Sequence, residues 1–170
     1  MAEIKLCLLD RDGVLNVDKA YLYKPEAVEW VADSLKAIAW LNRKGIKVAV
    51  VTNQSGVARG YFSESDVIKL HIWMQEEVQK AGGIISAFYY CPHLQGAPVK
   101  EYDRDCNCRK PKPGMILQAL HDFGVKPENA FMAGDSPRDV EAAEAAGVRG
   151  YLYPGGSLLE FVQGILREEK

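Results

Sequence analysis

Short apolar runs alternate with longer helical stretches along almost the whole chain, and this alternation constrains the fold more than any other feature. The predicted strands are residues 5–10, 47–53, 86–91, 129–135 and 149–154. They are continuously apolar, which is typical of a parallel sheet covered on both faces. The predicted helices lie between them, at 33–45, 63–83, 113–124 and 136–147. We therefore predict an α/β fold with a doubly wound, Rossmann-like parallel sheet and right-handed crossovers.

Capping signals mark where the predicted helices begin. Asp33 is placed to cap the first helix, and Ser63 with Asp66 forms a capping-box pattern at the start of the second. Ser136 is the expected N-cap of the last predicted helix, with Pro137 at its first position.

The composition is that of a water-soluble globular protein. The 170 residues favour a single domain over 1–170, with no repeat or composition break to suggest a second one. A net charge of −2 gives no electrostatic reason to expect nucleic acid or a membrane surface as partner. Neither a leader nor a membrane-spanning segment is recognisable, so we expect a cytoplasmic protein, monomeric by default.

The segment 92–112 has neither helical nor strand periodicity, and such a long loop in a compact domain needs a reason. The zinc loop, 91–108, carries a possible tetrahedral ligand set with the spacing Cys91-x-His93-x12-Cys106-x-Cys108. A disulfide is disfavoured in a reducing compartment, and thiols without a ligand remain the alternative. Four protein ligands leave no open position, so we predict a structural Zn²⁺. Cys7, inside the first strand, is predicted to be a core residue.

Carboxylates follow two of the predicted strands. Asp10 and Asp12 follow the first strand and Asp135 ends the fourth, while the second runs into the polar turn 52–56. If strands one and four are neighbours, Asp10 and Asp135 converge, and their oxygens suit Mg²⁺. Each carboxylate could instead serve only as a turn or cap residue. His71 and His121, on helices and without such company, are predicted to be ordinary surface or half-buried residues.

These charges suggest the hydrolysis of a phosphate monoester. An attack by the Asp10 carboxylate on a phosphate brings two anions together, so Mg²⁺, Lys110 and Arg109 are needed to neutralise them. Asp12 can protonate the leaving oxygen and then deprotonate a water molecule. The zinc loop would fix the approach of Arg109 and Lys110, which directly follow Cys108.

Four segments resemble the sequence motifs of the haloacid dehalogenase superfamily of phosphatases: DRDGVLN, VTNQSGVARG, CRKPKPGM and GDSPRDVEAA. Their order and spacing cover almost the whole chain. The zinc loop and the second motif are similar to those of the D-glycero-D-manno-heptose 1,7-bisphosphate 7-phosphatases and the related histidinol-phosphate phosphatases.

The resemblance implies a role for each matching position. Asp10 would be nucleophile and Mg²⁺ ligand, Asp12 acid/base and Mg²⁺ ligand through its backbone carbonyl, and Asp135 the third ligand. Thr52 and Lys110 would hold the phosphoryl group. The substrate would contact Asp18, Lys19, Ala20, Tyr21, Asn53, Gln54, Ser55, Arg109 and Ser136. Asp139 would support the metal site without a defined role, and the sheet order would be 3-2-1-4-5.

The spacing of the motifs leaves no room for the separate cap domain that many relatives use. Only 41 residues separate Asp10 from Thr52, and 57 separate Thr52 from Lys110. We therefore expect an open site in which short loops and Arg109 select the substrate. A phosphomutase is disfavoured, because such enzymes generally need a cap to retain an intermediate.

Three functions remain open. The first is a Mg²⁺-dependent phosphatase that removes the 7-phosphate of D-glycero-D-manno-heptose 1,7-bisphosphate through an aspartyl-phosphate intermediate, in the synthesis of heptose for bacterial surface glycan. The second is a histidinol-phosphate phosphatase of histidine biosynthesis. The third, from another class, is a non-catalytic binding module stapled by zinc.

Overall fold

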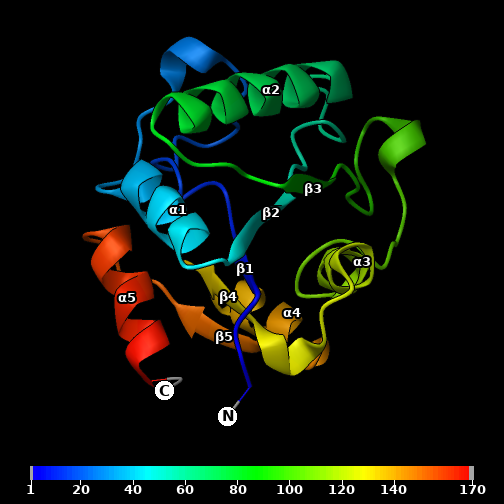
Figure 1. Ribbon diagram of the computed structural model, residues 1–170. Coiled ribbons are helices and arrows are strands. Elements are labelled where there is room, and N and C mark those ends of the chain that lie inside the picture. Colours follow the sequence, from blue (N-terminus) through cyan, green and yellow to red (C-terminus); the bar gives the residue numbers. More distant parts are fainter. Residues whose placement is uncertain (1, 169–170) are drawn as a thin grey trace.

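The computed structural model describes residues 2–168 and confirms the predicted five-stranded parallel sheet (Figure 1). The strands are β1 Leu6–Leu9, β2 Lys47–Asn53, β3 Ala87–Cys91, β4 Ala130–Gly134 and β5 Arg149–Leu152. Their spatial order is β3-β2-β1-β4-β5, as expected, and all four pairings are parallel. Strands β1 and β4 are therefore neighbours, which the predicted magnesium site requires.

Within residues 2–168, five α-helices cover the sheet in two layers. They are α1 Ser34–Arg43, α2 Glu64–Lys80, α3 Gly114–Phe123, α4 Pro137–Ala145 and α5 Leu158–Glu168. Short 3₁₀ helices lie at η1 Pro25–Ala27, η2 Lys100–Tyr102 and η3 Pro127–Asn129. Helices α1, α2 and α5 pack against one face of the sheet, and α3 and α4 against the other (Figure 1).

Helix α5 was not predicted from the sequence. Its buried residues, Leu158, Val162 and Ile165, recur at the spacing of one helical face, which is the signal that identifies it. The helix packs beside α1. It completes the cover over that face of the sheet.

The central strand β1 explains why this topology is stable. All four of its residues, Leu6 to Leu9, are 0% exposed, including Cys7, which is the predicted core residue. Burying a leucine side chain contributes about 1.5–3 kcal/mol. Because β1 side chains point alternately to the two faces, the strand anchors both hydrophobic layers.

Two of the three predicted caps are confirmed, and the third occupies its predicted position without a capping bond. Ser136 is the N-cap of α4, with Pro137 at its first position. Ser63 and Asp66 form a reciprocal capping box at the start of α2. Asp33 occupies the cap position of α1, but its backbone is left-handed (φ 59°) and its side chain makes no cap bond. Its carboxylate instead accepts a hydrogen bond from Ser157 Oγ at 2.7 Å, because the chain leading into α5 packs against the start of α1.

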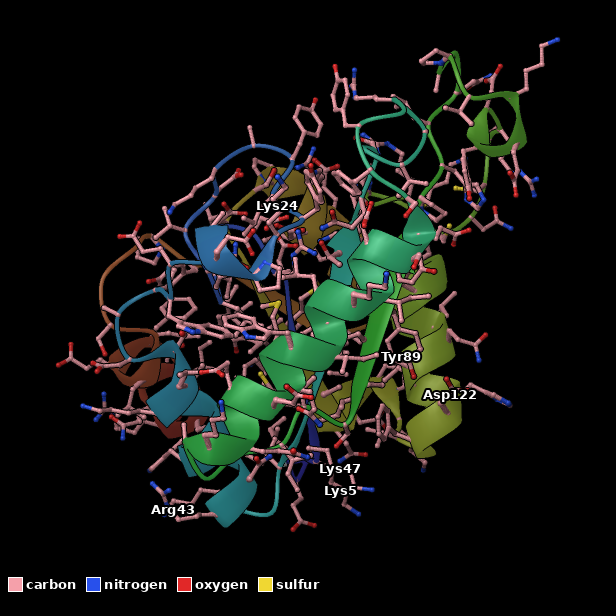
Figure 2. The ribbon with its side chains drawn as sticks, turned by 90° about the horizontal axis from the view of Figure 1, so that it is seen from above. Lys5, Lys24, Arg43, Lys47, Tyr89 and Asp122 are labelled. Carbon is pink, nitrogen blue, oxygen red and sulfur yellow. The ribbon has the colours of Figure 1, made fainter. Side chains whose placement is uncertain are left out.

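The parallel strands give the sheet two chemically different ends. Figure 2 shows Lys5 and Lys47, at the amino ends of β1 and β2, on the opposite side from Lys24 in the loop that follows β1. In the same view Tyr89 of β3 and Asp122 of α3 point toward one another, and the tyrosine hydroxyl donates to the carboxylate at 2.7 Å. None of the helices between residues 2 and 168 is long and apolar enough to cross a membrane.

Candidate active site

A polar cavity of about 340 Å³ lies at the carboxyl ends of the central strands. Every residue predicted for catalysis, phosphoryl binding or substrate contact lines this cavity, with the exception of Lys19. The ammonium of Lys19 donates instead to Ala27 O at 3.0 Å and pairs with Glu29 at 3.3 Å. The prediction that Lys19 contacts substrate is therefore not supported by its position, because η1 and the segment after it hold its charge.

Three carboxylates gather at one end of this cavity. Ligand oxygens of Asp10, Asp135 and Asp139 all lie within 4.8 Å of one another. Asp10 follows β1 and Asp135 follows β4, so the pairing of these two strands brings the two residues together. Asp139, on the first turn of α4, adds a third oxygen donor to the predicted pair. Carboxylate oxygens in this number suit a hard divalent cation such as Mg²⁺.

Lys110 is buried against this acidic cluster. Its ammonium lies 3.0 Å from Asp10 Oδ1 and 2.7 Å from Asp139 Oδ1, and it donates to Val51 O at 2.8 Å. Burial lowers the pKa of Lys110, but the charges of Asp10 and Asp139 outweigh that effect and raise it. Burial raises the pKa of Asp10 to about 7, against the opposing charge of Lys110. The lysine therefore stays protonated at the centre of the site.

Asn53 fixes the main chain of Lys110. Its amide nitrogen donates to Lys110 O at 3.1 Å, and its amide oxygen accepts from Lys110 N at 3.0 Å. Asn53 also lines the cavity, as predicted for a residue at the end of β2. Asn53 therefore also holds Lys110, which is separated from Thr52 by 57 residues, beside the end of β2.

Gly13 allows Asp135 to approach the strand end closely. A Cβ atom at Gly13 would lie 1.9 Å from Asp135 Oδ2, and its backbone has a positive φ of 88°. Only glycine combines this conformation with this space. Asp139 is fixed in turn by Ser136, whose N–H donates to Asp139 Oδ2 at 3.1 Å.

The carboxylate of Asp12 lies on the cavity wall and is held by its neighbours. Arg11 pairs with it at 3.1 Å, and the side-chain amides of Asn16 and Gln54 donate to it at 3.0 and 3.1 Å. Arg11 is 0% exposed and also contacts His71 Nε2 at 3.1 Å. His71 was predicted to be a surface or half-buried residue, and this is wrong, because it is only 5% exposed. His121 is exposed, as predicted.

Two arginines that the sequence reasoning did not single out join Arg109 in the cavity. Arg59 and Arg138 both line it. Burial, followed by the positive charges of Arg138 and Arg59, lowers the pKa of Arg109. Arg59 Nε and Arg109 Nη1 are buried without a hydrogen-bond partner among the described residues. Both missed arginines lie inside the quoted motifs, which was the available signal.

The four predicted zinc ligands converge at the end of β3, whose last residue is Cys91. The sulfurs of Cys91, Cys106 and Cys108 lie 2.9–3.5 Å apart, and His93 Nδ1 lies 3.4 Å from Cys108 Sγ. Tetrahedral sulfur ligands of zinc lie roughly 3.8 Å apart, so the cluster fits a single ion. The thiols are free, and a hydrogen bond with Cys91 lowers the pKa of Cys108 to about 5. A thiolate is the form that binds zinc.

The comparisons with known proteins agree with this geometry. The family model of the haloacid dehalogenase-like hydrolases matches residues 17–147. A D-glycero-beta-D-manno-heptose-1,7-bisphosphate 7-phosphatase of Rhodopseudomonas palustris is 43% identical over 160 residues, covering 94% of this chain and 89% of the relative. An enzyme of the same name from Pasteurella multocida is 41% identical, covering 85% and 78%.

A solved structure is similar over the whole length. The D,D-heptose 1,7-bisphosphate phosphatase of B. bronchiseptica, complexed with magnesium and phosphate, superimposes with a TM-score of 0.84 at 33% identity, covering 97% of this chain and 99% of the other. The chain therefore belongs to the haloacid dehalogenase-like hydrolases, and it is a phosphoric monoester hydrolase.

Proposed function

We propose that this enzyme removes the 7-phosphate of D-glycero-D-manno-heptose 1,7-bisphosphate in bacterial heptose synthesis. The observation that carries the proposal is a single cavity with an acid–lysine cluster, Asp10 and Lys110, and a separate arginine group, Arg59, Arg109 and Arg138. A substrate with one phosphate at the reacting centre and another beyond it matches this charge arrangement. The names of the relatives point to the same substrate.

Each step of the proposed reaction uses a residue at a strand end. A carboxylate oxygen of Asp10 attacks phosphorus, and the bond between phosphorus and the sugar oxygen breaks. Asp12 gives its proton to that oxygen, which leaves an aspartyl phosphate. A water molecule then loses a proton to Asp12 and attacks phosphorus, releasing inorganic phosphate and restoring Asp10. Thr52 and Lys110 hold the phosphoryl oxygens throughout.

Magnesium is the cofactor that we propose for Asp10, Asp135 and the backbone carbonyl of Asp12, with Asp139 within the same cluster. When bound, it supplies positive charge that offsets repulsion between the phosphate and the carboxylates. Zinc is the ion that we propose for the cysteine and histidine cluster, where it would have a structural role.

The arginine group also bears on the alternative substrate, histidinol phosphate. Beyond its phosphate, that substrate carries an ammonium group, which three neighbouring arginines would repel. A second phosphate would instead be attracted by Arg59, Arg109 and Arg138, which all line the cavity. The alternative is therefore the less favourable of the two.

The test is phosphate release measured side by side on the heptose bisphosphate, a heptose 7-phosphate and histidinol phosphate. We expect the bisphosphate to give the highest kcat/KM, and Asp10→Asn to abolish turnover of all three. Arg59→Gln and Arg138→Gln should each raise KM for the bisphosphate by on the order of tenfold, while hardly changing KM for the monophosphate.

Arg43→Gln is the matched control, because Arg43 lies at the opposite end of the sheet (Figure 2) and should have no effect. A higher kcat/KM for histidinol phosphate than for the bisphosphate would reject the proposal.

A further inference from the structure

Arg11 is a completely buried cation that contacts Asp12, the loop after β1 and helix α2. Its Nε donates to Asp12 Oδ1 at 3.2 Å, and its Nη2 donates to Asp12 Oδ2 at 3.1 Å. The same Nη2 donates to Leu22 O at 3.0 Å, in the loop that carries Asp18 and Tyr21 into the cavity. One guanidinium therefore fixes both the proposed acid/base residue and the loop beside the substrate.

The remaining nitrogen of this guanidinium, Nη1, contacts His71 of α2. Arg11 Nη1 lies 3.1 Å from His71 Nε2. A guanidinium can only donate, so Nε2 must accept and the ring proton must sit on Nδ1. Burial, followed by the charge of Arg11, lowers the pKa of His71 to about 3, which keeps the ring a neutral acceptor.

The imidazole itself is held by packing from β3. Its ring stacks on Phe88 with centroids 4.5 Å apart and an interplanar angle of 17°, and it meets the edge of Tyr90 at 6.1 Å. Helix α2 also contacts η1, and Figure 1 shows the two side by side. The position of the acceptor is thus set by two elements outside the cavity.

We infer that His71 is a positioning residue of this phosphatase, which acts through Arg11 to hold the Asp12 carboxylate at the cavity wall. Without its acceptor, Arg11 Nη1 would be buried and unpaired, and the guanidinium could turn toward other partners. A rotation that breaks the two-point contact with Asp12 displaces the group that transfers the proton. The inference rests on the proposed function, because Asp12 is the acid/base residue only in that reaction.

The decisive comparison uses two substrates that differ in their leaving group. The leaving group of the heptose bisphosphate is a sugar alkoxide, which needs a proton from Asp12. The leaving group of p-nitrophenyl phosphate is a stabilised phenolate, which needs that proton far less. The parameter is kcat/KM, because it reports the steps up to departure of the leaving group. A variant that is merely less stable loses activity on both substrates equally.

His71→Phe retains an aromatic ring beside Phe88 but removes the acceptor. We expect it to lower kcat/KM for the heptose bisphosphate by on the order of tenfold or more, and for p-nitrophenyl phosphate by less than about threefold. His71→Gln restores an acceptor in place of Nε2 and should recover most of the loss. His121→Phe makes the same substitution at an exposed histidine of α3 and should change neither value.

Arg11→Lys gives an independent test should His71→Phe not fold, because lysine keeps the charge but loses the two-point contact with Asp12. It should show the same substrate-selective loss. Equal losses on both substrates, or no loss in any of these variants, would overturn the inference. If the wild type hydrolyses p-nitrophenyl phosphate but not the bisphosphate, the proposed substrate fails, and His71 is then tested with whichever alkyl phosphate the enzyme hydrolyses.

Discussion

At the scale of single residues, buried and half-buried polar side chains hold the groups that line the cavity in place. Asn53 makes two hydrogen bonds to the main chain of Lys110, and Arg11 donates to the Asp12 carboxylate and to Leu22 O. Lys110 likewise depends on its main chain for its place between Asp10 and Asp139. The reacting groups are therefore only as well placed as these supports.

Asn53→Ala tests whether the hydrogen bonds to Lys110 matter for activity beyond their contribution to stability. The substitution removes both hydrogen bonds to the main chain of Lys110, so we expect kcat to fall by on the order of tenfold. Asn42→Ala is a matched control, because Asn42 also bonds two main-chain groups, Ile46 O and Ile84 N, but lies outside the cavity.

Both asparagine variants should lose about 1–3 kcal/mol in the free energy of unfolding. Only Asn53→Ala should lose activity. Urea unfolding and phosphate-release assays on the two proteins provide the comparison, and equal activities would contradict the role of Asn53.

His71 should also make stability depend on pH. Its pKa is about 3 in the folded protein and 6.5 as a free side chain, so below pH 6.5 the unfolded chain binds a proton that the folded protein excludes. Relative to His71→Gln, the wild type should lose about 1.4 kcal/mol of unfolding free energy for each pH unit below 6.5, down to about pH 3.

Urea unfolding of both proteins from about pH 7 to about pH 5 measures this difference. His121→Gln serves as the control, because an exposed imidazole should give no comparable slope. A constant difference between wild type and His71→Gln over this range would show that His71 protonates freely in the folded state.

At the scale of elements, we expect the segment between β3 and α3 to depend on its cysteine and histidine cluster for order. It contains only the short helix η2 and contributes little to the hydrophobic core. Helix α2 also contacts this segment, because Glu64 accepts a hydrogen bond from Tyr102 of η2 at 2.8 Å, as it does from Tyr90 of β3. Metal binding at Cys91 to Cys108 would offset the ordering entropy of this loop.

Removal of zinc should therefore reduce both stability and activity. Cys108→Ser should lower the zinc content, the melting temperature and kcat together, because Arg109 and Lys110 follow this residue directly. Cys7→Ala, in the fully buried strand β1, should lower the melting temperature while leaving the zinc content unchanged. Metal analysis and thermal unfolding of the two variants test this, and full activity of zinc-free protein would refute it.

At the scale of the whole molecule, the site exists because segments far apart in sequence end at one edge of the sheet. Asp10 and Asp135 come together through the pairing of β1 with β4, while Lys110, from the segment between β3 and α3, reaches Asp10 beside the end of β2. Asp135 lies so near Gly13 that a Cβ atom at this glycine would meet its carboxylate.

Gly13→Ala should disturb this approach. Its Cβ atom would meet the Asp135 carboxylate, so we expect activity and magnesium affinity to fall at least tenfold, on the order expected for a misplaced ligand. Gly45→Ala is the matched control, with a similar φ of 79° but nothing within 4 Å of its Cβ. Both variants carry backbone strain, but only Gly13→Ala should need more magnesium for half-maximal activity, and equal requirements would contradict this account.

The sequence determined the fold class, the strand order through its family resemblance, and nearly all of the cavity residues. Short apolar runs and their helical spacers are local signals, and functional groups at strand ends follow from the geometry of a parallel sheet. The amphipathic stretch of α5 was also readable, although it was not predicted. Local signals of this kind need no knowledge of what lies across the molecule.

Only the tertiary structure decided which hydrogen-bond partners individual polar side chains have. Asp33 fits a cap pattern, yet its carboxylate accepts a hydrogen bond from Ser157 instead of capping the helix. Lys19 lies in the loop that follows β1, yet its ammonium donates to Ala27 O. His71 has no local sign of its role, because its partner Arg11 lies 60 residues away. Hydrogen bonds between distant segments depend on packing in three dimensions, which a linear pattern of residue types does not encode.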